Sequence, residues 1–242
     1  MNPINRIKTF FKPSQIQHPL VEKNDRPTPN RECYSAYGEE LLAQAWFEFN
    51  GYDLSTLTYL DIGAAHPFHL SNTYLFYRYG AKGVLVEPDP DQVAFLRQKR
   101  PLDTTVSAGI SFDTQRGSAK LYQMNLPFFN TFSSTQAAYV LESSKGWKSE
   151  HQLTLVKEVD VPMIPINEII EEYMAGVSPD YLSIDVEGHD LDVLKSLDLE
   201  RFKPKIICIE PSNKTHIFDE ILIPHGYSLM AKTPDNALYM RF

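Results

Sequence analysis

The sequence has little of what several classes of protein need. Its 242 residues include only two cysteines, so no disulfide framework or cysteine-rich metal site is expected, and a reducing cytoplasm fits. No apolar run approaches the length that crosses a bilayer, and the first residues lack the continuous apolar region of a secretory signal. Basic charge is not in excess either. The formal net charge of −8 argues against a general affinity for nucleic acid or anionic lipid.

A glycine-rich phosphate-binding pattern is also missing. The segment "YLDIGAAHPFHLSNT" at 59–73 resembles the first strand and turn of a nucleotide-binding fold. It does not have the G-x-G-x-x-G spacing that lets backbone N–H groups approach a pyrophosphate. A nucleotide-dependent oxidoreductase is therefore disfavoured.

Helical and extended patterns alternate from Gly38 onward. The first predicted helix ends at Gly51 and has an apolar stripe made of Leu41, Leu42, Ala45, Trp46 and Phe49. Later patterns predict strands within 56–63, 82–88, 104–111, 120–124, 153–161, 180–185 and 203–211, helices within 72–80, 89–100, 166–174 and 191–197, and a polar loop at 130–136. Asp89 caps the helix at 89–100, with Pro90 at its first position and Gln92 completing a capping box. Two alternating stretches around a Pro-Asp-Asn turn predict an antiparallel hairpin over 226–242.

This alternation predicts an α/β fold in which right-handed crossovers join the strands of a mostly parallel sheet, with helices on both faces. We expect residues 34–242 to form this domain and residues 1–33 to form an N-terminal extension. A packing arm is the favoured interpretation of the first dozen residues, and a short surface helix that touches a membrane or a partner is the alternative. Ligands of such sheets bind beyond the carboxyl ends of the strands.

Four predicted strands end in a carboxylate, at Asp61, Glu87, Asp185 and Glu210. Because the carboxyl ends of parallel strands share one edge of a sheet, that edge would be negatively charged and would favour a cationic ligand or a metal ion. S-adenosylmethionine fits this requirement, since its sulfonium and ammonium groups outweigh its single carboxylate. An acid at Glu87, at the end of the second strand, can accept hydrogen bonds from both ribose hydroxyls.

The motifs resemble the FkbM family of S-adenosylmethionine-dependent methyltransferases. They are "YLDIGAAHPFHLSNTYLFYRYGAKGVLVEPDP", "YLSIDVEGHDLDVLKSLDLERFKPKIICIE" and, less closely, "YSAYGEELLAQAWF", and "DVEGHDLDVL" is the strongest. The resemblance runs from about residue 34 to the end. It departs from the family at Ala36 and Glu40, and at Ala108-Gly109, where an Asn is frequent near the adenine.

This resemblance implies a Rossmann-like class I methyltransferase fold, a seven-stranded sheet whose last strand is antiparallel. It also implies O-methylation of a hydroxyl on a sugar, glycan or natural-product small molecule. The implied cofactor-binding residues are Gly38, Glu39, Asp61, Gly63, Ala64, His66, Glu87, Pro88, Ala108, Asp185 and Glu187. Asp185 is assigned to the methionine end of the cofactor or to the acceptor, and Glu187 to the cofactor pocket.

The candidate catalytic residues are Asp185 and His189. An alcohol must lose a proton during methyl transfer, and an imidazole, whose unperturbed pKa lies near neutrality, is a reasonable general base. The alternative is that His189 caps the following helix or lies in solvent. Asp185 with Glu210 offers an alternative magnesium site, but two carboxylates are thin evidence and magnesium is not favoured.

Other candidates have equally ordinary alternatives. His66 contacts the cofactor tail or the substrate, or it is a loop histidine held by Pro67. Gly38 and Glu39 cover the cofactor or cap a helix. Polar and aromatic residues that could contact an acceptor, or could simply be exposed or packed, are Asn130, Thr131, Ser133, Tyr34 and Tyr37. For the whole chain, the alternative to an enzyme is a non-catalytic Rossmann-like binding module in a glycan or envelope pathway.

Overall fold

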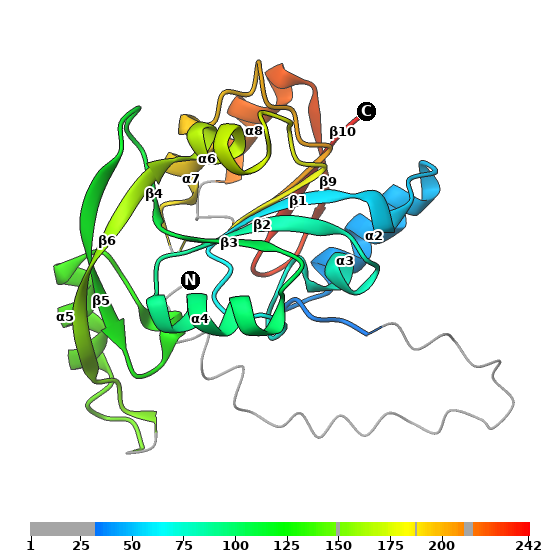
Figure 1. Cartoon of the computed structure of the whole chain (residues 1–242). Coiled ribbons are helices and arrows are strands. Elements are labelled where there is room, and N and C mark those ends of the chain that lie inside the picture. The colour runs from blue at the N-terminus through cyan, green and yellow to red at the C-terminus, as the bar shows by residue number, and fades with distance from the viewer. Residues whose placement is uncertain (1–31, 149–150, 187, 211–214) are drawn as a thin grey trace, which may run out of the picture. The chain divides into compact units, whose positions relative to one another are not determined.

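The computed structural model describes residues 32–148, 151–186, 188–210 and 215–242 (Figure 1). Within them, Cys33–Phe242 form one compact unit. The predicted N-terminal extension lies almost wholly outside the described residues. Among the helices described, none combines the length and apolar character that a bilayer-spanning segment needs.

The central sheet has seven strands in the order β3-β2-β1-β7-β8-β10-β9. The strands are β1 Thr58–Ile62, β2 Lys82–Glu87, β3 Thr104–Ser107, β7 Tyr181–Ile184, β8 Ile206–Ile209, β9 Tyr227–Lys232 and β10 Ala237–Arg241. The pairs among β1, β2, β3, β7 and β8 are parallel, whereas β10 runs antiparallel to both β8 and β9. This topology confirms the predicted Rossmann-like sheet with a closing antiparallel hairpin.

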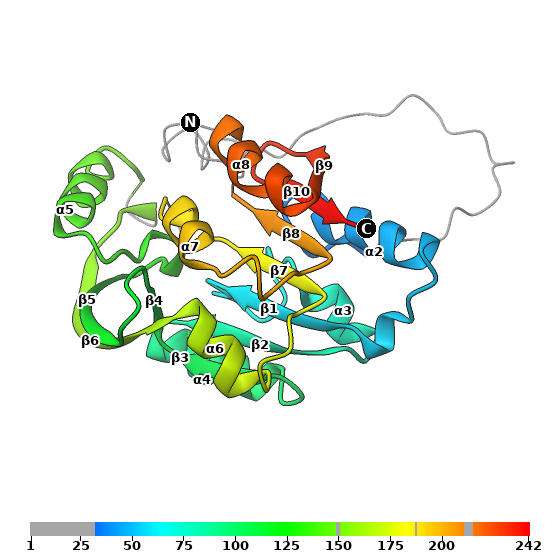
Figure 2. The same cartoon turned by 90° about the horizontal axis from the view of Figure 1, so that it is seen from above.

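Helices cover both faces of this sheet (Figures 1 and 2). One face packs against α2 Glu39–Phe49, α3 Tyr74–Arg78 and α4 Pro90–Lys99, and the other against α6 Ile166–Tyr173, α7 Asp190–Ser196 and α8 Thr215–Leu222. Alternate residues of β1 serve the two cores, since Tyr59 packs with the first group and Leu60 with the second. Burial on both faces explains why the strands read as continuous apolar runs.

The chain that follows β3 forms a second, three-stranded sheet. It consists of β4 Gly109–Ser111, β6 Leu155–Pro165 and β5 Gly117–Met124, in that order, and α5 Ser134–Ser143 packs against it. The single strand predicted at 104–111 is therefore wrong, because the chain leaves the central sheet at Ala108 and β4 pairs with β6 instead. A Cβ on Gly109 would lie 2.7 Å from Met163 Sδ, so the glycine permits this close pairing.

The apolar stripe predicted for α2 is also wrong. The buried face of α2 contains Glu39, Glu40, Ala43, Gln44 and Phe47, whereas Phe49 is 90% exposed. The helix can bury its two acids because donors near its start satisfy them. Ser35 N–H donates to Glu40 Oε1 (3.2 Å), and Tyr37 N–H donates to Glu39 Oε2 (2.9 Å).

Candidate functional site

The carboxyl ends of β1, β2 and β7 are tied together by the backbone. Gly63 N–H donates to the carbonyl of Val86 (3.0 Å), and Asp185 N–H donates to that of Ile62 (3.0 Å). Gly63 has φ +82°, and a Cβ at this position would lie 1.8 Å from the carbonyl oxygen of Asp185. Only glycine permits this approach. The structure thereby brings the chain segments that follow Asp61, Glu87 and Asp185 to one edge of the sheet.

Glu87 is buried at the end of β2, with 6% of its surface exposed. Its two carboxylate oxygens accept hydrogen bonds from the N–H groups of Ala65 and Asp89, each at 2.8 Å. Burial raises the pKa of Glu87 to about 7, and the neighbouring charges of Asp89 and Asp61 act in the same direction. Each carboxylate oxygen has a second lone pair, so the group can still accept two hydroxyl donors.

Asp61 takes part in a buried polar network around Arg100. Its Oδ2 accepts a hydrogen bond from Thr73 Oγ1 (2.6 Å), and burial raises its pKa although the Arg100 cation opposes this. Arg100 has no exposed surface and donates to Asp103 Oδ2 (2.7 Å) and Tyr59 Oη (3.0 Å). These contacts position the loop after β1. That Asp61 itself binds the cofactor stays a prediction.

Sequence reasoning missed Arg100. It ends the polar run "LRQKR", and nothing in that run distinguishes it from the solvated Arg and Lys residues before it.

The loop after β1 folds back on β2. Ala64 N–H donates to the carbonyl of Val86 (3.2 Å), and Ala65 has a left-handed backbone with φ 45°. His66 Nδ1 accepts the N–H of His69 (2.9 Å), while burial, followed by the neighbouring His69, lowers the pKa of His66. The His66 ring also packs edge-to-face against Phe95 of α4, with ring centroids 5.3 Å apart, and its contact with the cofactor stays a prediction.

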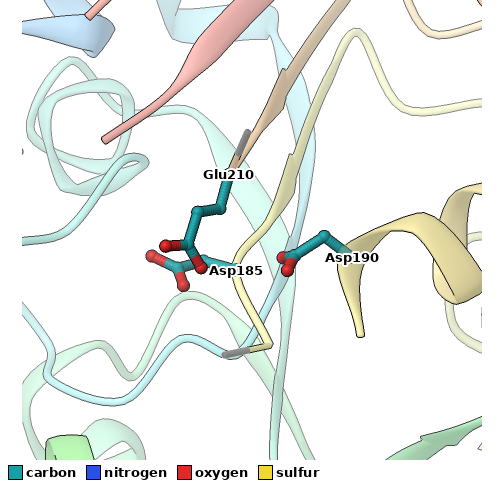
Figure 3. A group of neighbouring side chains, drawn as sticks. All are labelled: Asp185, Asp190 and Glu210. Carbon is teal, nitrogen blue, oxygen red and sulfur yellow. The ribbon is translucent and has the colours of Figure 1, made fainter. Parts of the chain in front are cut away.

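Three carboxylates come together where β7 and β8 end. One oxygen each from Asp185, Asp190 and Glu210 lies within 4.8 Å of the other two, and Figure 3 shows Asp185 and Glu210 close to each other with Asp190 beside them. Asp190 was not among the predicted site residues, and Glu187 lies outside the described residues. The sequence signal for Asp190 was its place in "DVEGHD", three residues after Glu187.

Asp190 holds the turn between β7 and α7. Its two oxygens accept the N–H groups of Val186 (3.0 Å) and Gly188 (3.2 Å). Burial raises the pKa of Asp190 to about 6, and the charge of Asp185 adds to this. Groups of acidic residues like this one are common without an ion, so the cluster by itself does not favour magnesium.

His189 precedes α7, and its side chain makes no capping hydrogen bond. The ring is half exposed, its Nδ1 lies 3.3 Å from Asp192 Oδ2, and it stacks on Phe112 with ring centroids 5.2 Å apart. Sequence reasoning did not identify Phe112, which comes from the distant β4–β5 connection.

Gly38 and Glu39 begin α2. Gly38 has φ +82°, and Glu39 Oε1 accepts a hydrogen bond from Thr233 Oγ1 (2.6 Å) in the β9–β10 turn. Burial acts to raise the pKa of Glu39, but hydrogen bonds from Ser35, Thr233 and Tyr37 outweigh it and the pKa is lowered. Glu39 thus links the helix to the hairpin as an ionised group.

Two further predicted residues border Glu87. Ala108 is fully buried, and its N–H donates to the carbonyl of Glu87 (3.2 Å), while Pro88 directly follows Glu87. In the predicted polar loop, Ser133 caps α5, a helix that the sequence pattern did not reveal.

The model of the methyltransferase FkbM domain matches residues 61–228. The chain belongs to this methyltransferase family. Its cofactor is S-adenosylmethionine. The residues present fit that cofactor, since the edge that follows Asp61, Glu87 and Asp185 is acidic and Glu87 retains acceptor capacity for ribose hydroxyls.

No curated protein matches the sequence. Among solved structures, this methyltransferase is similar to a TehB-like SAM-dependent methyltransferase from Corynebacterium glutamicum, with 10% identity, a TM-score of 0.36, and coverage of 84% of this chain and 98% of the other. The precorrin-6y C5,15-methyltransferase from Geobacter metallireducens gives 12% identity, a TM-score of 0.40, and coverage of 93% and 100%. The fibrillarin pre-rRNA processing protein from Methanococcus jannaschii gives 12% identity, a TM-score of 0.37, and coverage of 77% of this chain and 66% of the other. The family assignment rests on the family model alone.

Proposed function

We propose that this methyltransferase acts in the cytoplasm and transfers the methyl group to a hydroxyl of a sugar, glycan or natural-product small molecule. The observation that carries the proposal is the arrangement of His189 beside the carboxyl end of β7. An ionised Asp192 can only accept, so His189 Nδ1, 3.3 Å away, carries the proton between them. In the neutral imidazole with its proton on Nδ1, Nε2 is the acceptor and can take a proton from an alcohol.

The surroundings of His189 support a ring-shaped acceptor. Phe112, 44% exposed, stacks on His189 and also lines a hollow of about 780 Å³. Most of the other residues around the hollow are polar, including Ser111, Thr114, Gln115 and Ser118. An aromatic wall beside hydroxyl and amide groups suits a sugar, which has apolar ring faces and many hydroxyls.

In this proposal each residue of the site has a separate role in methyl transfer. When bound, S-adenosylmethionine supplies an electrophilic methyl group on its sulfonium. Glu87 holds the ribose hydroxyls, and Asp185 holds the cofactor's amino group or the acceptor. His189 takes the hydroxyl proton, and the Phe112 ring orients the acceptor.

Methyl transfer from labelled S-adenosylmethionine to a panel of methyl glycosides tests this proposal. General base catalysis contributes about 100- to 10,000-fold, so His189→Ala should lower kcat by at least about 100-fold and leave the affinity for S-adenosylhomocysteine unchanged. His225→Ala is the control, because His225 hydrogen-bonds the carbonyl of Ile221 in another part of the fold.

An unchanged kcat in His189→Ala would show that His189 is not the general base. A wild-type protein that binds the cofactor but methylates no hydroxyl acceptor would instead favour the non-catalytic module.

A further inference from the structure

The hollow beside Phe112 has charged residues of both signs in its wall. Asp113 and Arg116, both exposed and both from the β4–β5 connection, line it. A guanidinium in such a wall would ordinarily bind a carboxylate or phosphate of a ligand in two-pronged fashion. Whether Arg116 can do so depends on what it already binds.

Two carboxylates of α6 occupy Arg116. Its Nε donates to Glu168 Oε2 (2.7 Å), and its Nη2 donates to Glu172 Oε2. The two acids are four residues apart and therefore lie on one face of the helix. The hydrogen bond from Arg116 lowers the pKa of Glu172, which keeps this group ionised. With Asp113 included, one cation faces three carboxylates at the hollow.

Further negative charge lies on the other side of Phe112. The His189 ring stacks on Phe112, and Asp192 Oδ2 is 3.3 Å from His189 Nδ1. Asp190, the next residue after His189, belongs to the carboxylate cluster where β7 and β8 end. An acceptor whose hydroxyl reaches His189 from the hollow would thus have carboxylates on both sides. Charges of one sign along a cleft repel a ligand of the same sign.

We propose that the site takes a sugar without an acid group as its methyl acceptor and rejects an anionic sugar. Glu168 and Glu172 determine this specificity, because they occupy the guanidinium that would otherwise bind the acid group. This inference rests on the hydroxyl acceptor proposed above and narrows its class.

The affinities of methyl glucuronamide and methyl glucuronide for the intact chain test the inference. The two probes have the same size and differ in charge, and an NMR titration in the presence of S-adenosylhomocysteine measures both without turnover. At about 20 mM salt the wild type should bind the amide about tenfold or more tightly. Near 1 M salt, where the Debye length is about 3 Å, the preference should fall to about threefold or less.

Equal affinities at low salt, or a preference that salt does not change, would overturn the inference. Binding of neither probe would contradict the sugar acceptor and this inference together. Binding with the expected ratio but without methyl transfer would contradict only the proposed function, so the two failures are distinguishable.

Exchange of the two acids of α6 tests their role. Glu168→Gln/Glu172→Gln frees Arg116 and should lower the preference for the amide to about twofold or less. The control Glu158→Gln/Glu171→Gln removes the same charge from carboxylates that pair with other cations, and it should keep the wild-type preference. Adding Arg116→Gln to the first variant should restore most of the preference. An equal change in both double variants, or a first variant that keeps the full preference, would refute the specificity assigned to Glu168 and Glu172.

Discussion

At the scale of single residues, Gly83 illustrates how closely the strands beside the site pack. A Cβ on Gly83 would lie 2.0 Å from Tyr59 Cδ2 and 2.5 Å from the carbonyl oxygen of Tyr59. The Tyr59 ring cannot move aside, because it is fully buried and its hydroxyl donates to Asp103 (2.6 Å).

Gly83→Ala should therefore destabilise the protein by about 1–3 kcal/mol or more, and thermal denaturation should show a Tm lower by roughly 3–10 °C. Gly117→Ala is the matched control, since no atom lies within 4 Å of the position of its added Cβ. Equal Tm values for the two variants would show that the Tyr59 contact is not restrictive.

A site residue could be predicted from the sequence where the pattern that marks it lies within a few neighbouring residues. Glu87 and Asp185 stand out because each ends an apolar strand, and that pattern is contained in a few residues. Arg100 acquires its place in the network through Tyr59 and Thr73, which are distant in sequence, so no local pattern marks it. Phe112 is similar, since only the fold brings it to His189.

At the scale of elements, Arg100 joins the end of α4 to β1 and to the loop that follows β1. Its guanidinium also donates to Thr73 Oγ1 (3.1 Å), and the Asp103 side chain that it pairs with has no exposed surface. Without the cation, Asp103 would lose a hydrogen-bond donor and buried Asp61 would lose the positive charge that lowers its pKa.

Arg100→Met should lower the free energy of unfolding by about 3–5 kcal/mol in urea denaturation, because it breaks a buried ion pair. Lys99→Met, at the preceding exposed position, should change it by less than about 1 kcal/mol. A loss in Arg100→Met as small as in Lys99→Met would show that the network does not stabilise this region.

The strands β1, β2, β7 and β8 could be predicted because burial on both faces requires continuous apolar runs. The face of α2 could not, because donors outside the helix satisfy Glu39 and Glu40. Of the capping box predicted at the start of α4, the part played by Asp89 is confirmed and the part played by Gln92 is wrong. Asp89 accepts the N–H groups of Asp91 and Gln92, but Glu87, not Gln92, accepts the N–H of Asp89. α8 follows β8 and was not predicted.

At the scale of the whole molecule, the buried acids of the site link stability to pH. The pKa of Glu87 is raised to about 7 and that of Asp190 to about 6, both above their values in an unfolded chain. The folded state thus holds more protons than the unfolded state between about pH 4 and pH 7. Their contribution to stability is present below about pH 4 and is lost as the pH rises to 7.

The Tm of the protein without cofactor should therefore fall between pH 5 and pH 8 by more in the wild type than in Glu87→Gln, which has no group to ionise at this position. Differential scanning fluorimetry across this range measures both slopes. Parallel curves would contradict a raised pKa of Glu87.

The most direct test of the acidic site at the strand ends is titration calorimetry with S-adenosylmethionine at pH 8, where Glu87 is ionised. The account predicts one binding site in the wild type and, since a hydrogen bond to a charged group contributes about 1.5–3 kcal/mol, at least about tenfold weaker binding in Glu87→Gln. The exposed control Glu142→Gln should bind like the wild type. Absence of binding to the wild type, or equal affinity in Glu87→Gln, would contradict it.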